Sequence, residues 1–298
     1  MKILGLKDLK KYKSNSVITI GFFDGVHMAH QVLLNNLVAK AKKNNYESVV
    51  ITFSDEVLSL FKMSNNIMTL DDKLEILKQL GVDNVVVLPP LDNFMGMSAK
   101  EFKEVYLDSL KTKIVVCGSD FSFAKNKEGN INYLKNNSNY EILEIEDIYD
   151  ENGNKISSTY IRNLLKDGKV ELANKYLYND FSIKSLVISG KEIGRTIGFK
   201  TANLLINNQL KLLKHGVYFG KVIVDQLEYK AMINVGYNPT VNEEESLKVE
   251  VHIANFNKEI YDDTIKVIFN KFHREEKKFA SLNELQTQLQ LDLKELEN

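Results

Sequence analysis

The sequence predicts an α/β domain followed by an antiparallel β domain. Over residues 17–146, short runs of apolar, β-branched residues alternate with amphipathic segments, which is typical of βαβ units and a mostly parallel sheet. After residue 181, apolar runs follow one another with only turn residues between them, which indicates antiparallel β-structure. A chain of 298 residues with 44% hydrophobic content is long enough to bury two cores.

Five strands are expected in the first half, separated by helices. The strands are predicted at residues 17–22, 48–53, 84–88, 113–118 and 140–145, and the helices at residues 30–44, 69–81 and 98–110. Thr69 is placed to cap the second helix and Gly81 to end it. Ser98, with Glu101 three residues later, forms a capping-box pattern for the third helix.

The second half is expected to form a small barrel of about six strands. Residues 156–177 contain two short helical patterns hinged at Gly168, and a last helix at 281–298 has Ser281 and Glu284 as its capping pair. Strands are predicted at residues 181–190, 215–226, 228–238, 246–256 and 260–272. The change of pattern puts the boundary near 178–184 and gives domains 1–180 and 181–298.

Composition excludes several classes of protein. A net charge of −1 argues against a nucleic-acid-binding protein. The single cysteine, Cys117, lies in an apolar run and is expected to be a buried thiol, so no disulfide framework is possible. The chain has no apolar run of about 18 residues and no signal-peptide pattern, so we expect a cytoplasmic protein with no membrane partner. The sequence leaves the oligomeric state unknown.

The stretch "GFFDGVHMAH", residues 21–30, follows the first strand of the main pattern and opens a helix. Ligands of open parallel sheets bind beyond the carboxyl ends of the strands, where helix N-termini attract anions. His27 and His30 are three residues apart and share a helix face, from which they could donate hydrogen bonds to phosphate oxygens. A chance pair of surface histidines is the alternative, whereas a zinc site is disfavoured because a third ligand is missing.

The stretch "GRTIGFKT", residues 194–201, is similar to a P-loop but does not have the residue order that defines one. A P-loop requires glycine immediately before lysine, and here Phe199 precedes Lys200. The stretch also lies between two predicted strands instead of between a strand and a helix.

Both stretches resemble signatures of one family, the bacterial bifunctional riboflavin kinases and FMN adenylyltransferases, also called FAD synthetases. "GFFDGVHMAHQVLL" resembles the pattern G-x-F-D-G-x-H-x-G-H, and "LGVDNVVVLP", "SAKEFKEVYL", "GSDFSF" and "ISSTYIR" follow in the family's order. "GKEIGRTIGFKTANL" resembles the riboflavin kinase pattern G-x-x-x-G-R-x-x-G-F-P-T-A-N-L. The resemblance implies a Rossmann-like nucleotidylyltransferase domain and a riboflavin-kinase-type six-stranded barrel with a terminal helix.

The resemblance also implies the reactions and substrates. Riboflavin and ATP would give FMN in the barrel, and FMN and ATP would give FAD and pyrophosphate in the first domain, with Mg²⁺ as the metal. In the first domain, His27 and His30 would stabilise the reacting phosphates, because the FMN phosphate is already an anion and needs no general base. The other residues implied there are Gly21, Asp24, Ser157, Ser158, Thr159 and Arg162 for ATP or pyrophosphate, and Asp120 and Phe121 for flavin.

In the barrel, the resemblance implies that Glu250 is the base for the ribityl 5′-hydroxyl of riboflavin, a neutral alcohol that must lose its proton. Without that match, a solvated strand glutamate would be the simpler interpretation. Thr201 and Asn203 would hold Mg²⁺, and Asn203 could also contact the phosphates. The remaining implied residues are Gly190, Gly194, Arg195 and Gly198 at the ATP phosphates and Arg274 near the flavin, although Arg274 also fits a surface charge run.

Several positions depart from the family pattern. Ala29 replaces the glycine of H-x-G-H, Ser122 and Ala124 stand where arginine and glycine are common, and Lys200 replaces a proline. The segment after the second strand reads "TFSDEV" and lacks the D-P-H-P histidine. Two alternatives therefore stay open: a riboflavin kinase whose first domain is catalytically weak, or one whose first domain is a regulatory nucleotide- or flavin-binding module.

Overall fold

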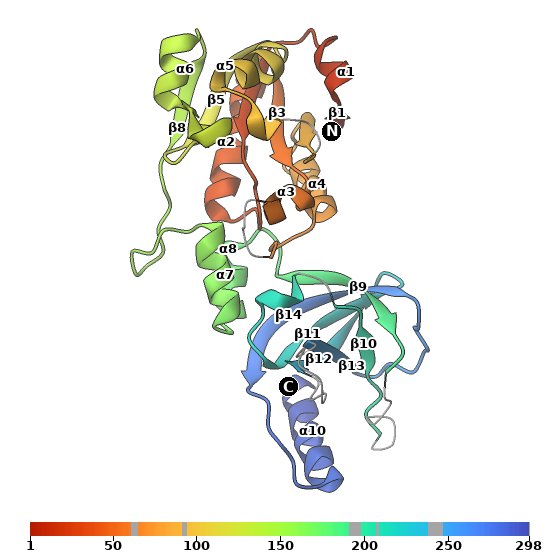
Figure 1. The fold of residues 1–298 in the computed structure, drawn as a ribbon. Helices are drawn as coiled ribbons and strands as arrows, with labels where there is room; N and C mark the ends of the chain where they lie inside the picture. The colour runs from red at the N-terminus through yellow and green to blue at the C-terminus, as the bar shows by residue number, and fades with distance from the viewer. Residues whose placement is uncertain (61–64, 91–93, 191–197, 207–208, 238–246, 298) are drawn as a thin grey trace. The chain divides into compact units, whose positions relative to one another are not determined.

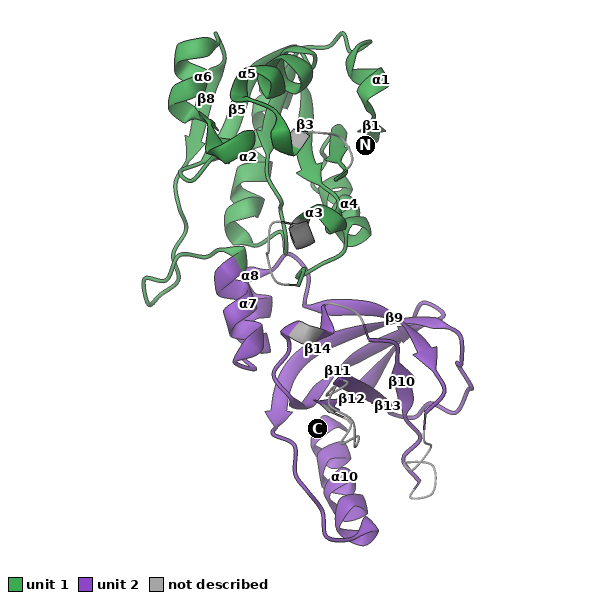
Figure 2. Cartoon of the chain, in the orientation of Figure 1, with its two compact units in different colours: residues 1–158 green, residues 159–298 purple. Residues whose placement is uncertain are grey.

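The chain folds into two compact units. The computed structural model describes residues 1–60, 65–90, 94–190, 198–206, 209–237 and 247–297. These residues divide into the units Met1–Ser158 and Thr159–Asn298 (Figure 2). The first unit contains a parallel sheet and the second a closed antiparallel barrel, so the fold class predicted from the sequence is confirmed.

The sheet of the first unit has six strands, all parallel, in the order β1-β4-β3-β2-β5-β8. Figure 1 labels its strands β1, β3, β5 and β8. Their bounds are β1 (Lys2–Leu4), β2 (Ser16–Ile20), β3 (Glu47–Phe53), β4 (Asn84–Leu88), β5 (Thr112–Gly118) and β8 (Glu141–Ile145). Five of the six are the predicted strands. The sequence pattern does not reveal β1, because a three-residue edge strand is too short to show a periodicity.

The strand order places a switch point at the centre of the sheet. From β2 the chain builds outward through β3 and β4 on one side, and through β5 and β8 on the other. Open α/β sheets bind ligands beyond the carboxyl ends of the two strands at such a point. The segment that follows β2 begins at Gly21, and the segment that follows β5 begins at Ser119, so both lie where a ligand is expected.

Helices and short turns connect these strands. Their bounds are α1 (Leu6–Leu9), α2 (Met28–Asn44), α3 (Asp55–Leu60), α4 (Leu70–Gln79), η1 (Phe94–Gly96), α5 (Ala99–Phe102), η2 (Lys103–Asp108), η3 (Lys125–Lys127) and α6 (Ile131–Asn137), with a small hairpin of β6 (Ser122–Phe123) and β7 (Gly129–Asn130). The predicted caps are confirmed: Thr69 accepts a hydrogen bond from Asp72 N, and Ser98 and Glu101 form a capping box. The helix expected over 98–110 is α-helical only to Phe102 and continues as a π-helical turn.

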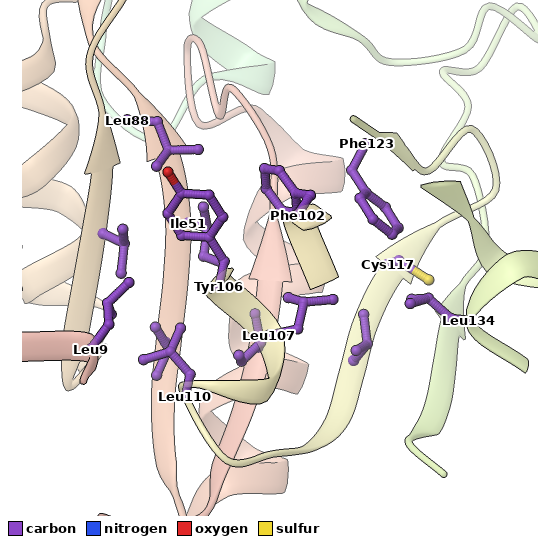
Figure 3. Packing of buried hydrophobic residues seen from close by; sticks show 14 of the residues in the cluster. Leu9, Ile51, Leu88, Phe102, Tyr106, Leu107, Leu110, Cys117, Phe123 and Leu134 are labelled. Atoms are coloured by element: carbon purple, nitrogen blue, oxygen red, sulfur yellow. The ribbon is translucent and has the colours of Figure 1, made fainter. Parts of the chain in front are cut away.

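The core of the first unit lies between the sheet and the helices that cover it (Figure 3). Phe102 and Tyr106 pack towards Ile51 of β3, and Cys117 of β5 packs near Leu134 of α6. Cys117 is 1% exposed, and burial raises the pKa of its thiol to about 12. The thiol is therefore neutral and acts as a small apolar group, as the sequence predicts.

The second unit is built around a six-stranded closed barrel with the order β10-β13-β12-β11-β14-β9. Its elements are α7 (Ser158–Lys166, beginning at the last residue of the first unit), α8 (Val170–Tyr176), β9 (Ser182–Ile188), β10 (Ala202–Leu204), η4 (Leu210–Leu212), β11 (Gly216–Val224), β12 (Leu227–Tyr237), β13 (Leu247–Ile253), β14 (Thr264–Arg274) and α10 (Leu282–Glu297). Gly168 has φ +76° between α7 and α8, which confirms the predicted hinge. The sixth strand, β10, comes from the "GFKTANL" segment and has only three residues.

The last helix, α10, covers part of the outer face of the barrel. Val249 and Val251 of β13 are buried on one face of their strand, while Met232 of β12 packs with Leu289 and Leu293 of α10 on the other side of the barrel wall. No helix among the described residues is long and apolar enough to cross a membrane. The barrel and α10 together enclose one of the two sites described next.

Candidate active sites

The segment after β2 is held in a strained conformation by hydrogen bonds. Phe23, Gly25 and Val26 have φ values of +50°, +85° and +37°. The carboxylate of Asp24 is 2% exposed and accepts hydrogen bonds from Ile67 N at 2.9 Å and Met68 N at 3.2 Å. The structure thus places the predicted phosphate-binding residue Asp24 inside the protein, where it fixes this segment.

His27 and His30 lie together at the start of α2. His27 is the N-cap residue, and the two imidazole rings stack with their centroids 3.7 Å apart. Burial, reinforced by His27 and Lys73, lowers the pKa of His30 well below 6.5. His30 is therefore neutral at neutral pH and serves as a hydrogen-bonding group. Its Nδ1 is buried without a hydrogen-bond partner among the described residues.

The predicted "ISST" segment meets the segment after β2. The hydroxyl of Ser158 donates to the carbonyl oxygen of Asp24 at 2.8 Å, across 134 residues of chain. Ser157 is half-buried next to it, and α7 begins at Ser158 as the predicted helix N-terminus. Thr159 and Arg162 follow on α7 in the second unit, where Thr159 is exposed and Arg162 is 5% exposed.

Lys73 of α4 is a buried cation that the sequence analysis did not identify. Its Nζ donates to Phe22 O at 3.0 Å, to Thr52 Oγ1 at 3.2 Å and to Phe53 O at 3.2 Å. Burial lowers the pKa of Lys73 to about 8, against the opposing effect of the nearby carboxylates Asp24 and Asp55. The sequence does indicate that Lys73 is buried, because helical spacing puts it on the same face of α4 as the buried residues Ile76 and Leu77.

The predicted flavin residues Asp120 and Phe121 follow β5. Asp120 is exposed and forms an ion pair with Lys155, which also pairs with Asp147 at 2.9 Å. Phe121 is half-buried and packs against the core of the first unit. Ala124, which replaces the family's glycine, has φ +64° and ψ 179°, a conformation that almost only glycine adopts without strain.

In the barrel, Glu250 lies at the centre of a row of three polar residues. It is directly opposite Asn203 of β10 on one side and Asn234 of β12 on the other. Because directly opposite residues of antiparallel strands share a face, the three side chains project to the same side of the sheet. Lys248, two residues away, donates from Nζ to Glu250 Oε1 at 2.6 Å.

Two pockets meet at Thr201. A pocket of about 330 Å³ lies between the outer face of the barrel and α10, and a smaller one of about 80 Å³ lies near the end of β9. The larger is lined by Phe199, Thr201, Val217, Met232, Asn234, Lys248, Glu250, His252, Arg274, Glu276, Lys277, Phe279, Leu285 and Leu289. The smaller is lined by Val187, Lys200, Thr201, Ala202, Val251, Ile253, Phe256, Lys258, Glu259, Ile260 and Tyr261. Thr201 therefore lines both pockets, and Glu250 borders the larger one.

The glycines of the predicted ATP segment are partly described. A Cβ added at Gly190 would meet Nδ2, Cγ and Oδ1 of Asn203 at 2.0–2.7 Å, so the Asn203 amide packs directly on the Gly190 backbone. Gly198 has φ +81°, which favours glycine. Gly194 and Arg195 lie outside the described residues.

The predicted flavin residue Arg274 borders the larger pocket and is fixed by Asp292 of α10. Its Nη2 and Nε donate to Asp292 Oδ2 at 2.6 and 3.0 Å, and His273 Nε2 lies 3.2 Å from Asp292 Oδ1. Although burial raises the pKa of Asp292, hydrogen bonds from Arg274 and Gln288 outweigh it and lower the pKa below the ordinary value. This network attaches α10 to the end of β14.

Thr201 and Asn203 are the metal ligands that the family resemblance implies. Among the described residues, no group of three or more His, Cys, Asp and Glu side chains is placed to hold a metal ion. Thr201 and Asn203 offer two neutral oxygen atoms, and the latter is held in place by Gly190. Mg²⁺ accepts such a sparse set when water and phosphate oxygens complete its shell, so these residues fit that ion.

Comparisons with known proteins match both halves of the chain. A family model described as FAD synthetase matches residues 9–160, and one described as riboflavin kinase matches residues 177–298. A curated protein of Buchnera aphidicola subsp. Schizaphis graminum is 35% identical, covering 98% of this chain and 97% of the relative. One of Bacillus subtilis is 34% identical, covering 96% and 93%. Both relatives are named bifunctional riboflavin kinase/FMN adenylyltransferase.

A solved structure shares the fold over the whole chain. It is described as a macrolide-efflux protein from Streptococcus pneumoniae and is 33% identical, with a TM-score of 0.89. The match covers 100% of this chain and 98% of that one. Both units of the present fold therefore occur together in another protein.

Proposed function

The chain belongs to the family of bifunctional riboflavin kinase/FMN adenylyltransferases, and we propose that its two activities divide between residues 1–180 and residues 181–298. The enzyme phosphorylates riboflavin with ATP to FMN and adenylylates FMN with ATP to FAD and pyrophosphate. The presence of both family domains favours this function over a kinase with a weak or regulatory first domain. We propose that the enzyme works in the cytoplasm, with riboflavin, FMN and ATP as its partners and without nucleic acid or membrane.

Adenylyl transfer is assigned to the carboxyl end of β2. The FMN phosphate attacks the α-phosphate of ATP, and pyrophosphate leaves. The protein has to align the two anions and stabilise the charge on the phosphoryl oxygens. His30 would donate a hydrogen bond as a neutral imidazole, because burial holds its pKa low, and His27 would donate from the ring stacked against it. The N-terminus of the 17-residue helix α2 would add the attraction of its unpaired N–H groups and dipole.

The other predicted residues divide between fixing the site and binding pyrophosphate. The contact between Ser158 and Asp24 supports a site that contains both the segment after β2 and the start of α7. The buried carboxylate of Asp24 would fix the conformation of the segment after β2. Ser157, Thr159 and Arg162 would hold pyrophosphate. Gly21 would leave room for ATP, and Asp120 with Phe121 would contact the flavin beyond β5.

Phosphoryl transfer is assigned to the surroundings of Thr201, which borders both of the pockets described above. The larger pocket has aromatic and aliphatic walls, including Phe199, Met232 and Leu289, which suit the flat ring of riboflavin. The smaller pocket would take part of ATP, with Gly198 near the phosphates. Gly190 and Asn203 border a further pocket of about 460 Å³, which would take the rest of the nucleotide. Thr201 borders both pockets, so the ATP phosphates and the ribityl chain would meet beside it. This shared residue is the observation that carries the proposal for the barrel.

Glu250 would remove the proton of the ribityl 5′-hydroxyl. Its Oε1 is held by Lys248, which leaves Oε2 for the hydroxyl. Thr201 and Asn203 would hold Mg²⁺, and Asn203 lies opposite Glu250 in the sheet. When bound, Mg²⁺ supplies positive charge to the phosphates.

One experiment tests the proposal. The purified protein is incubated with riboflavin, ATP and Mg²⁺, and FMN and FAD are resolved by chromatography; FMN is also supplied alone with ATP. We expect both products, with FAD formed from supplied FMN as well. FMN without FAD in both incubations would contradict the assignment of adenylyl transfer to residues 1–180. His27→Asn and His30→Asn should each abolish FAD formation and leave FMN formation unchanged.

A further inference from the structure

We propose that Lys73 is a positioning residue for adenylyl transfer, whose buried ammonium fixes the carbonyl ends of β2 and β3 and thereby the segment that carries His27 and His30. This inference rests on the proposed assignment of that reaction to the two histidines. It adds a residue from α4, which lies 43 residues beyond His30 in the sequence.

Lys73 binds backbone and hydroxyl oxygens instead of reaching towards a substrate. An ammonium group has three N–H donors, and Lys73 directs them to Phe22 O, Thr52 Oγ1 and Phe53 O. Its residue is 2% exposed. Because the three donors are used inside the protein, Lys73 can influence the reaction only through the groups that it holds.

The three acceptors lie at the carboxyl ends of two neighbouring strands. Phe22 follows β2 by two residues, Phe53 is the last residue of β3, and β2 and β3 pair in parallel. The carbonyl groups at this edge point towards the region where the anionic substrates are proposed to bind. An ammonium between them cross-links the two strand ends and offsets their partial negative charge.

A short chain of contacts connects Lys73 to His30. Phe22, whose carbonyl accepts from Lys73, directly precedes Phe23, which has φ +50°. The ring of Phe23 packs edge-on against His30, with the centroids 5.1 Å apart. Without Lys73, the Phe22 carbonyl would keep only the longer hydrogen bond from Thr52 Oγ1, at 3.3 Å. Its loss would therefore loosen the strained residue whose side chain supports the His30 ring.

Backbone groups at and just before the start of α4 also bind residues that follow β2 and β3. The backbone N–H groups of Ile67 and Met68 hold Asp24, and Leu70 N donates to Asp55 at 3.0 Å. Lys73 lies one turn further along the helix. The charged and titratable groups that act on it are Asp24 and Asp55, which favour its charged form, and the imidazole of His30, whose pKa Lys73 helps to lower.

The burial of Lys73 predicts how the rate of FAD formation depends on pH. Burial lowers the pKa of Lys73 to about 8, so the ammonium is charged at neutral pH and loses its proton in mildly alkaline solution. The neutral amine has one donor fewer and no charge to offset the strand carbonyls. FAD formation should therefore fall as the pH rises through about 8, whereas FMN formation in the same protein should not fall there.

The test compares Lys73→Met with Lys78→Met, which removes an exposed lysine from the same helix. With supplied FMN and saturating ATP, Lys73→Met should lower the kcat of FAD formation by about 100-fold, the scale expected for misplaced reacting groups. It should leave FMN formation unchanged and show no fall of the remaining rate above pH 8. Lys78→Met should behave as the unaltered protein in all three measurements.

Two results would overturn the inference. One is FAD formation by Lys73→Met within about twofold of the unaltered protein, which is the range of an ordinary surface change. The other needs no variant: a ratio of FAD to FMN formation in the unaltered protein that is constant from pH 7 to pH 10. If His27→Asn and His30→Asn lose FAD formation while Lys73→Met keeps it, the inference fails and the proposed site stands. If the histidine variants keep FAD formation, the proposed site itself is wrong.

Discussion

Asp292 of α10 and Arg274 of β14 form a bidentate ion pair, in which Arg274 Nη2 donates to Asp292 Oδ2 at 2.6 Å and Arg274 Nε donates to Oδ1 at 3.2 Å. Asp292 is fully buried, so the pair lies in the interior between the helix and the barrel. Arg274 also borders the pocket assigned to riboflavin. The ion pair therefore couples the attachment of α10 to the shape of that pocket.

Replacing Asp292 by asparagine should weaken the attachment of α10 and the binding of riboflavin. Arg274 would lose its counter-ion in a buried place, which costs roughly 3 kcal/mol. We expect a higher KM for riboflavin, measured by FMN formation, and an unchanged rate of FAD formation from supplied FMN. Glu297→Gln, which changes an exposed carboxylate of the same helix, should have little effect on either rate. An unchanged KM for riboflavin in Asp292→Asn would contradict the coupling.

The same ion pair predicts how the barrel responds to acid. The pKa of Asp292 is lowered from its ordinary value of 3.8, although burial alone would raise it, because Arg274 and Gln288 bind the carboxylate. Its contribution to the free energy of unfolding is therefore present above pH 3.8 and is lost as the pH falls through the lower folded-state pKa. Denaturant titrations from pH 6 to pH 2 should show this loss in the unaltered protein and a smaller one in Asp292→Asn.

Glu250→Gln should stop phosphorylation of riboflavin but not adenylylation. Glutamine keeps the shape and removes the base, and loss of a general base lowers a rate by about 100- to 10,000-fold. FMN and FAD formation are measured by chromatography, with FMN supplied for the second reaction. Glu228→Gln, an exposed glutamate of β12 paired with Lys221, is the matched control and should keep both rates. A normal rate of FMN formation in Glu250→Gln would show that another group is the base.

Gly190→Ala should impair the kinase through Asn203. The new methyl group would overlap the whole Asn203 amide, whose nearest atom lies 2.0 Å from the added Cβ. Displacing Asn203 removes a proposed Mg²⁺ ligand, so the Mg²⁺ concentration needed for half-maximal FMN formation should rise. Asn203→Ala should have the same effect. Gly96→Ala, at a glycine with nothing within 4 Å of the added Cβ, is the control. If Gly190→Ala keeps the Mg²⁺ dependence of the unaltered protein, Asn203 does not hold the metal.

Ala124→Gly should stabilise the first unit. Ala124 has φ +64° and ψ 179°, a conformation that costs about 1–3 kcal/mol for a residue with a Cβ. Part of this gain is offset by the greater backbone freedom of glycine in the unfolded chain, so we expect about 1 kcal/mol of added stability. Ala99→Gly, in the helix α5, should instead lower the free energy of unfolding. Urea titrations of both variants give the comparison, and a less stable Ala124→Gly would contradict the strain.

The fold follows from the sequence more fully than the sites do. Hydrophobic periodicity and caps such as Thr69 predict the main strands and helices, because these depend on local spacing. β1 and β10 were missed because three residues show no period. Glu250 faces Asn203 only because of the strand register, and Ser158 meets Asp24 across 134 residues; neither relationship has a local signal.

Two functional candidates could have been found from their spacing. Asp292 falls on the helical stripe of Leu289 and Leu296, and Lys73 falls on the stripe of Ile76 and Leu77. A charged residue at an otherwise apolar position of a helix is rarely buried without a partner. What the sequence could not supply was that partner, because Arg274 and the strand-end carbonyls come from other parts of the chain.

The position of Thr201 on the borders of both barrel pockets also constrains the order of events during catalysis. If ATP and riboflavin bind in these two pockets as proposed, donor and acceptor would occupy the enzyme at the same time, and the γ-phosphoryl group would pass from one to the other in a single in-line displacement. The reaction would invert the configuration at phosphorus, and initial-rate plots against the two substrates would intersect instead of running parallel. A chiral thiophosphoryl group carried from ATP to riboflavin would record that single inversion.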